Sequence, residues 1–419
     1  MKKPVGGNDS SRLTLLLVLL AAAVTSCTGP TEPTRPAISA EILAAVPTSY
    51  SRAITIDYTR VPGTDQKNFP VLVSGTYDGQ NETPDLRWTG KGGKVQNANG
   101  YDVGFYTSST CSRGKLKWET ERYNALTGEV AYWVRVPVVY HTQNTVFYLC
   151  YGNAGITSNQ AQPSAVWDSH YLTVWHLADK GAGLDLSNSA DTKYALTNSG
   201  QVSSAPGKIG GGTNKFALRD STLVTDPNGN YYTYSYDYLD NPTVTLAKNG
   251  PLTISFWKLI LASDGYPENK VIDGNHISAA MGADHDQLNS MTVWAPFFCD
   301  ASWNYALEGP NLVNQWCGPP SYYDRWVYVT VVFNPAAGRF KGIYLDGVLV
   351  GSTINGATTT ANIIGFRLGQ DRIGHGPDPS QFDEVRISNS VRTADWIKAE
   401  FNNQNDPASF YAIGAEIVH

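Results

Sequence analysis

The sequence predicts an all-β protein with two consecutive antiparallel β-sandwich (jelly-roll) domains behind a signal peptide and a proline-rich linker. Short stretches rich in Val, Thr, Tyr and Trp recur between clusters of Asn, Asp, Gly and Pro, a pattern typical of strands and turns. Long helical periodicity is nearly absent. About 370 residues follow the linker, which favours two domains. The predicted ranges are 1–26 for the signal peptide, 27–49 for the linker, 50–168 for the first sandwich and 169–419 for the second.

The N-terminus has the composition of a secretory signal. Two lysines and Arg12 precede an apolar run from Leu13 to Val24. As a helix this run would extend only ~18 Å, too short to span a hydrocarbon layer of ~30 Å. The Val-Thr-Ser sequence before Cys27 resembles the signal of bacterial lipoproteins, in which the chain is cut before a cysteine that becomes lipidated. An ordinary signal peptide with a chance cysteine is the alternative.

The segment after Cys27 has prolines at positions 30, 33, 36 and 47 and little apolar periodicity. Proline-rich segments are extended and semi-rigid, so we expect a stalk between a membrane and the folded domains. Thr28 in place of an aspartate is compatible with export to the outer membrane. The sequence therefore predicts a lipid-anchored protein of the bacterial cell envelope, at the outer membrane or the cell surface, whose lipid is its only membrane contact.

Five cysteines are present, and four remain once Cys27 carries a lipid. An even number in an exported protein favours disulfides. We expect Cys111 to pair with Cys150 and Cys299 to pair with Cys317, because each pair then lies within one predicted domain. The other pairings and free buried thiols are the alternatives.

Charge argues against nucleic acid as a partner. The formal net charge is −6 and no basic run occurs. Loss of the signal peptide makes the chain more acidic, because most of the charged residues in that segment are basic. Nucleic-acid binding therefore has little electrostatic support.

Six stretches between residues 50 and 165 have the composition of strands. In one of them alternation places Tyr132, Val134, Val136 and Val138 on one face, as in a half-buried strand. The stretches are RAITIDYTRV, FPVLVSG, YDVGFYTS, KLKWETERY, VAYWVRVPVV and TVFYLCYGN. Through most of these, and through the following AVWDSHYLTVWHL, the segment resembles the bacterial family called domain of unknown function 2341. That resemblance brings no activity with it.

From about residue 170 the sequence resembles the laminin-G-like branch of the concanavalin A-like jelly rolls. The similarity covers an opening strand with its Asp- and Asn-rich turn, a central strand, a hairpin, and a closing strand with a short helix. These stretches are VWHLADKGAGLDLSNSADTKYALT, GPLTISFWKL, RWVYVTVVFNPAAGRFKGIYLDGVLVGS and QFDEVRISNSVRTADWIKAEF. Residues 228–242 and 294–326 depart from the family pattern, and insertions on a rigid sandwich commonly determine specificity.

The closing strand begins with two adjacent carboxylates, Asp383 and Glu384. Strand alternation would point them to opposite faces. A glycosidase instead needs both carboxylates beside one bond, about 5 to 9.5 Å apart. We therefore interpret the pair as a structural feature of the closing strand, which the resemblance to the jelly rolls supports, and not as a catalytic acid and base.

The insertion at 294–326 is rich in aromatic residues. Sugars stack on aromatic rings, so this insertion, closed by a disulfide between its two cysteines, is the first candidate for a glycan-binding platform. The alternative is that its rings form a small core beneath a long loop. Its candidate ligand-binding residues are Trp294, Trp303, Tyr305, Trp316, Tyr322 and Tyr323. The other insertion has alternating tyrosines, which are candidates for a surface that binds a glycan or a protein: Tyr232, Tyr234 and Tyr236. The alternative is that they pack on the neighbouring domain.

No cofactor is required by the sequence, and the resemblance to the jelly rolls suggests only a structural calcium ion. Jelly rolls of this branch often hold calcium between the first turn and the closing strand, which corresponds loosely to Asp185 and Asp383. Calcium takes about six to eight oxygen ligands, and no spacing here matches an EF-hand loop. Solvated turn aspartates are the alternative.

The sequence shows no catalytic motif: HExxH, GxSxG and phosphate-binding glycine loops are absent. Concanavalin A-like glucanases carry a Glu-x-Asp-x-x-Glu strand motif, and the nearest approach is Glu119 and Glu121, which lack the aspartate and lie in the other domain. His176 is expected to be a core histidine. We therefore predict a module that binds a glycan or a surface protein without chemistry. The alternatives are a glycan hydrolase or lyase with an unrecognised site, and a structural protein of an envelope or extracellular assembly.

Overall fold

The computed structural model describes residues 49–419 with several gaps. The residues left out within that range are 180, 182, 228, 260, 262–276, 282–290, 295–302, 310–311, 319–323, 339, 355–361 and 370–379. The predicted signal peptide, Cys27 and Cys299 therefore lie outside the described residues. Among the helices that the structure describes, none is long and apolar enough to cross a membrane.

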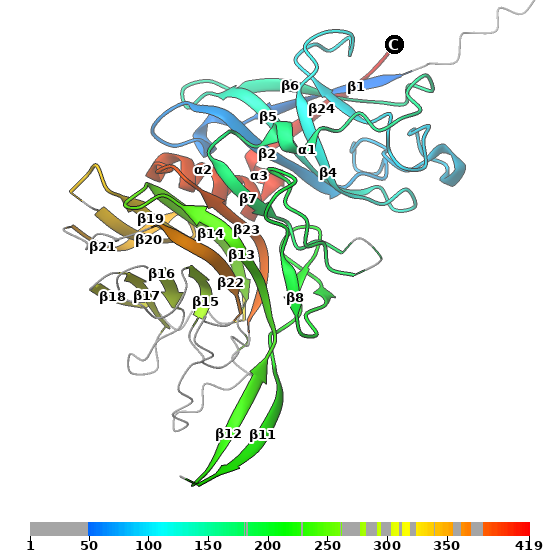
Figure 1. Ribbon diagram of the computed structural model, residues 1–419. Helices are drawn as coiled ribbons and strands as arrows, with labels where there is room; N and C mark the ends of the chain where they lie inside the picture. The colour runs from blue at the N-terminus through cyan, green and yellow to red at the C-terminus, as the bar shows by residue number, and fades with distance from the viewer. Residues whose placement is uncertain are drawn as a thin grey trace, which may run out of the picture. The chain divides into compact units, whose positions relative to one another are not determined.

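The first sandwich combines a four-stranded sheet, β24-β1-β6-β3, with a three-stranded sheet, β2-β5-β4 (Figure 1). Alternating residues of β5, among them Tyr132, Val134 and Val136, enter the core between these sheets, whereas Val138 is only half-buried. Trp133 is buried on the opposite face of β5, so the three-stranded sheet is covered on both sides. The strands are β1 (Tyr50–Ile56), β2 (Gln66–Thr76), β3 (Gly104–Tyr106), β4 (Lys117–Tyr123), β5 (Glu129–Val139), β6 (Thr145–Tyr151) and β24 (Tyr411–Val418).

The second sandwich packs a six-stranded sheet, β21-β20-β19-β14-β23-β7, against a seven-stranded sheet, β18-β17-β16-β15-β22-β13-β8. Phe256, Phe366 and Phe382 are fully buried in the core between them. The strands are β7 (Tyr171–Trp175), β8 (Thr197–Ser199), β13 (Tyr238–Leu246), β14 (Leu252–Leu259), β15 (Ile277–Met281), β16 (Met291–Trp294), β17 (Trp303–Gly309), β18 (Leu312–Gly318), β19 (Trp326–Asn334), β20 (Phe340–Leu345), β21 (Val348–Thr353), β22 (Ile363–Leu368) and β23 (Gln381–Ser388). The predicted all-β class, with antiparallel sheets packed as sandwiches, is confirmed.

Short elements connect the sandwiches and extend from them. Strands β11 and β12 form a two-stranded hairpin that pairs with no other described strand and projects from the second sandwich (Figure 1). These elements are the 3-10 turns η1 (Tyr58–Arg60) and η2 (Thr89–Lys91), helix α1 (Pro163–Val166), and strands β9 (Ser204–Ala205), β10 (Gly212–Thr213), β11 (Leu218–Asp226) and β12 (Gly229–Tyr236).

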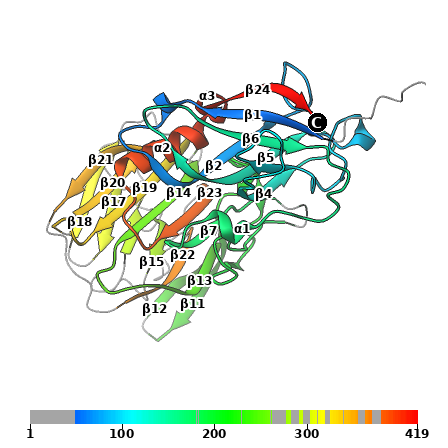
Figure 2. The same cartoon turned by 90° about the horizontal axis from the view of Figure 1, so that it is seen from above.

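The C-terminal segment, which the sequence assigned to the second sandwich, completes the first one. Helix α2 (Ala394–Asn405) begins at Thr393, whose hydroxyl accepts a hydrogen bond from the Trp396 amide, and α3 (Pro407–Phe410) leads into β24. Figure 2 shows α2 and α3 beside β2. Trp396, Phe410 and Tyr411 lie in the core of the first sandwich, and β24 pairs with β1. The chain therefore crosses back to its starting sheet.

Helix α2 also protects the open edge of β2. The Asn403 carboxamide accepts a hydrogen bond from the Leu72 amide at 2.7 Å and donates one to the Leu72 carbonyl at 3.1 Å. This pair of bonds imitates the pairing that another strand would give. It satisfies buried backbone groups that would otherwise cost free energy.

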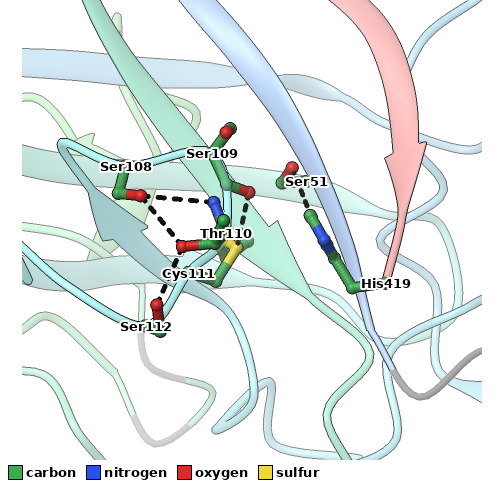
Figure 3. Close-up of a disulfide and its surroundings, with 8 residues drawn as sticks. Ser51, Ser108, Ser109, Thr110, Cys111, Ser112 and His419 are labelled. Atoms are coloured by element: carbon green, nitrogen blue, oxygen red, sulfur yellow. Dashed lines mark hydrogen bonds between the residues drawn. A yellow bond between two sulfur atoms is a disulfide. The ribbon is translucent and has the colours of Figure 1, made fainter.

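The predicted disulfide between Cys111 and Cys150 is confirmed (Figure 3). It links a loop rich in Ser and Thr to β6, across 39 residues of sequence. On the same sheet the last residue, His419, makes a 2.9 Å hydrogen bond with the buried Ser51 hydroxyl of β1. A disulfide is typical of an oxidising, extracytoplasmic compartment.

Candidate functional site

A group of charged side chains lies between the two sandwiches, where the β2-β5-β4 sheet faces β7 and β23. Aromatic and aliphatic residues of both sandwiches surround it, among them Trp133, Trp167 and Ile209. All of its members are at most 6% exposed. We call it the buried ionic cluster; its members are Glu119 and Glu121 of β4, His176 after β7, Asp383, Glu384 and Arg386 of β23, and Glu400 of α2.

A β-bulge turns both carboxylates of β23 toward this cluster. Phe382 and Val385 both belong to the core of the second sandwich, although they are three positions apart. The register of β23 with β14 shifts between Ser255 and Trp257, and Glu384 has a positive φ of 54°. A bulge takes up one extra residue in just this way. The expectation that Asp383 and Glu384 point to opposite faces is therefore wrong, because it assumed uninterrupted alternation.

His176 lies at the centre of the cluster and contacts three carboxylates. Its Nδ1 is 2.6 Å from Oε1 of Glu384 and 3.5 Å from Oε2 of Glu121. Its Nε2 is 3.2 Å from Oε2 of Glu119. The ring also stacks on Trp133, with 5.9 Å between the ring centroids. His176 is a buried histidine as expected, but its two nitrogens face carboxylates while Trp133 and Trp167 pack on its ring.

The two glutamates of β4 are held by donors from both sandwiches. Glu119 accepts hydrogen bonds from the Ser189 hydroxyl at 2.5 Å and from the Trp167 indole at 3.1 Å. Glu121 accepts one from the Trp133 indole at 2.7 Å. Its other oxygen lies against Gly210, where an added Cβ would come within 2.1 Å of it, so only glycine fits at that position.

Arg386 supplies the permanent positive charge of the buried ionic cluster. Its guanidinium donates to Oε2 of Glu384 at 2.6 Å and to Oε1 of Glu400 at 2.5 Å. It also lies over the Trp133 ring, 4.4 Å from the centroid. Arginine suits such a site because its planar fork can bridge two carboxylates and stack on an aromatic face.

The pKa values follow from burial and from these contacts. Burial alone would lower the pKa of His176, but the carboxylates of Glu384, Glu119 and Glu121 raise it well above its ordinary value. Burial and the charge of Glu384 raise the pKa of Glu121 to about 8. Burial, with Glu384 and Glu121 nearby, also raises the pKa of Asp383 well above its ordinary value. Burial first, and the crowding of like charges second, therefore favour the protonated form of some acids in the cluster.

Glu119 and Glu384 remain ionised. Burial, the largest single influence, would raise the pKa of both, but the charge of His176 and the hydrogen bonds to each carboxylate together outweigh it, so that both pKa values are lowered. Hydrogen bonds from Ser189 and Trp167 lower the pKa of Glu119 further, and Arg386 lowers that of Glu384. Their enclosure separates these carboxylates from solvent: Glu119 is 4% exposed and Glu384 is fully buried.

The residues predicted to bind a ligand lie elsewhere, on the seven-stranded sheet. Trp294 ends β16, and Trp303 and Trp316 lie in the paired strands β17 and β18, where Tyr305 is in register with Trp316. At these positions the aromatic insertion is not a long loop, because it continues the sheet beyond β15. Tyr322, Tyr323 and the partner proposed for Cys317 lie outside the described residues.

The remaining predicted residues lie in the projecting hairpin, in the segment between β7 and β8, and in β23. Tyr232, Tyr234 and Tyr236 lie in β12 of the projecting hairpin, and Tyr236 is half-buried. Asp185 accepts hydrogen bonds from the amide and hydroxyl of Ser187, and Asp383 accepts one from the Ile209 amide. Within the described residues, one group of three side chains has the spacing of metal ligands: Glu121, His176 and Glu384. That group does not include Asp185 or Asp383, so calcium at those two residues stays a prediction.

Sequence comparison identifies part of the second sandwich. Residues 233–398 match the sequence model of the concanavalin A-like lectin/glucanases superfamily, Laminin_G_3. This stretch contains a concanavalin A-like domain, in agreement with the predicted jelly roll. No curated protein sequence matches the chain.

The solved structures that match the chain do so at low similarity. Domain 4 of AbnA, a GH43 extracellular arabinanase from Geobacillus stearothermophilus solved with arabinotriose, matches with 16% identity and a TM-score of 0.38, over 55% of this chain and 98% of that domain. A structure of botulinum neurotoxin type C, whose cell entry depends on two ganglioside molecules, matches with 14% identity and a TM-score of 0.37, over 56% of this chain and 51% of the toxin chain. The chain thus spans about half the length of the toxin chain.

Proposed function

We propose that the chain is a lipid-anchored bacterial surface protein that binds a glycan through its second sandwich and performs no chemistry. The match of residues 233–398 to the lectin and glucanase superfamily carries this proposal. The sheet of that domain is extended by β16, β17 and β18, which contain Trp294, Trp303, Tyr305 and Trp316. Aromatic residues on a regular sheet are suited to stacking against sugar rings.

The clustered glutamates that the structure describes support binding rather than hydrolysis. A glycosidase must bring two carboxyl groups to a bond of its substrate. Glu119, Glu121 and Glu384 lie close together, but they are enclosed between the sandwiches and engaged by donors of the protein. The first sandwich, with its resemblance to domain of unknown function 2341, would then serve as the base on which the binding domain is mounted.

Glycan binding is tested by alanine substitution on the extended sheet. On a glycan array, the mature ectodomain should bind a defined set of glycans, and Trp303→Ala or Trp316→Ala should weaken that binding at least about tenfold, equivalent to about 1.4 kcal/mol. Trp88→Ala, on a half-buried tryptophan of the first sandwich, is the matched control and should bind normally. Melting is measured in parallel; a Trp316→Ala protein that melts early yet binds normally would assign this ring to the core and contradict the proposal.

The lipid anchor is tested separately. Replacing Cys27 with Ser should move the protein from the membrane fraction to the soluble fraction of exported proteins, because the thiol that accepts the lipid is gone. Cys111→Ser, which removes a cysteine of the disulfide instead, should stay with the membrane. Retention of the Cys27→Ser protein in the membrane after signal cleavage would contradict lipid anchoring.

A further inference from the structure

The buried ionic cluster has an excess of acidic groups that its own cations do not match. Five carboxyl groups, those of Glu119, Glu121, Asp383, Glu384 and Glu400, meet one arginine and one histidine. Burying charge without a counter-charge is costly. Protons or an additional cation must therefore neutralise the remainder.

Three of these side chains have the spacing of metal ligands. One ligand atom each from Glu121, His176 and Glu384 lies within 4.8 Å of the other two. The closest approaches are those of His176 Nδ1, at 2.6 Å from Glu384 and 3.5 Å from Glu121. A single ion between them would need only small side-chain movements, since bonds of zinc to nitrogen and carboxylate oxygen are about 2.0–2.2 Å long.

Each of the three side chains is also oriented by an outer partner, as ligands of metal sites usually are. The second nitrogen of His176 faces Glu119, which is fixed by Ser189. Glu384 uses one oxygen for Arg386 and presents the other to His176. Glu121 is held by the Trp133 indole.

Two carboxyl oxygens of the cluster are buried without a hydrogen-bond partner in the part of the chain that the structure describes. Oε1 of Glu121 and Oδ1 of Asp383 have no hydrogen-bond partner among the described residues, although both side chains are more than nine-tenths buried. Buried polar atoms are nearly always satisfied in folded proteins. A cation bound by Glu121 would satisfy the first of these two carboxyl groups, whereas the raised pKa of Asp383 favours its uncharged form.

We propose that Glu121, His176 and Glu384 bind a divalent transition-metal ion, Zn²⁺, which ties the two sandwiches together. The ligand set joins β4 of the first sandwich to β23 and the residue after β7 in the second. Binding of the ion would release the protons of His176 and Glu121. The resulting two carboxylates and neutral imidazole balance the charge of the ion, and imidazole with carboxylate suits zinc. This site differs from the proposed glycan surface and does not depend on glycan binding. Asp383, expected with Asp185 to hold calcium, belongs to the same cluster but is not one of the three ligands.

The test uses the mature chain without a histidine tag. Zinc content is measured by elemental mass spectrometry, and thermal melting is followed after stripping with a chelator and after adding Zn²⁺. Wild type is expected to hold about one zinc per chain, and its melting temperature is expected to fall on stripping and rise by several degrees on reloading, because a ligand of the native state stabilises it. Wild type without bound zinc and without a response in melting would overturn the proposal.

Matched variants locate the ion. Glu121→Gln keeps the shape and the contact with Trp133 but removes a ligand charge, so it should abolish the response to zinc. Asp383→Asn, an equally buried acid outside the triad, should retain it. A Glu121→Gln protein that responds like wild type would overturn the proposal. Should that variant fail to fold, Co²⁺ titration of the wild type decides: a visible absorption band that Zn²⁺ removes supports the site, and its absence refutes the site.

Discussion

Replacing Arg386 with Met is expected to lower the free energy of unfolding by about 3–5 kcal/mol, the usual cost of removing one partner from a buried ion pair. The guanidinium bridges Glu384 and Glu400, and its side chain is only 1% exposed. Methionine fills a similar volume but removes the ion pair of Glu400 and leaves Glu384 with His176 alone. Urea denaturation of the mature chain, followed by tryptophan fluorescence, measures the loss.

Two further variants test whether the geometry of the guanidinium and its burial, and not its charge alone, account for the loss. Arg386→Lys should also be destabilising, because one ammonium cannot reproduce the bridge or the stacking on Trp133. Arg325→Met removes an ion pair with Asp346 in which the arginine side chain is 41% exposed, and it should cost no more than about 1 kcal/mol. If Arg386→Met unfolded at the urea concentration of wild type, the buried ionic cluster would contribute little to stability.

A chain that ends at Asp406 is expected to lose the folded first sandwich. The deletion removes β24, which pairs with β1 along its whole length from Tyr50 to Ile56. It also removes Phe410 and Tyr411 from the core, and a single Phe→Ala change in a core costs about 3–5 kcal/mol. Near-ultraviolet circular dichroism and limited proteolysis should show residues 50–168 as a loosened, cleavable segment.

The matched control is a chain that ends at Val418. It lacks only His419, whose ring bonds to Ser51 and whose amide bonds to Ser49. Its melting should be close to that of the full chain, because it retains β24 and both core aromatics. A chain ending at Asp406 that resisted protease like this control would show that the first sandwich is stable without its C-terminal strand.

Local patterns in the sequence were enough to predict the fold class. Alternation in β5 predicted that Tyr132 and Val134 enter a core, and the structure places them there. The disulfide between Cys111 and Cys150 followed from counting cysteines and keeping pairs within a domain. The jelly-roll stretches around β14, β19 and β23 were also identified correctly. These features depend on residues a few positions apart or on composition, which a sequence displays directly.

The position of the C-terminal segment could not be read in the same way. Strand β24 has the alternation of any edge strand, and nothing in its residues names β1 as its partner. The aromatic insertion likewise gave no sign that Trp303 and Trp316 would lie in strands β17 and β18. Strand pairing depends on which sheet edge is free in the folded chain. The packing of the whole protein determines which edge that is.

The sequence by itself determined the all-β fold class and supplied the residues of the candidate sites. Only the tertiary structure brought Glu121, His176 and Glu384 together. Glu119 and Glu121 were noted as an incomplete glucanase motif, His176 as a core residue and Glu384 as part of a structural pair. His176 and Glu384 are 208 positions apart, and the bulge in β23 reverses the face that simple alternation assigns to one of its carboxylates. Contacts at such separation follow from how two sheets pack face to face, which no local periodicity records.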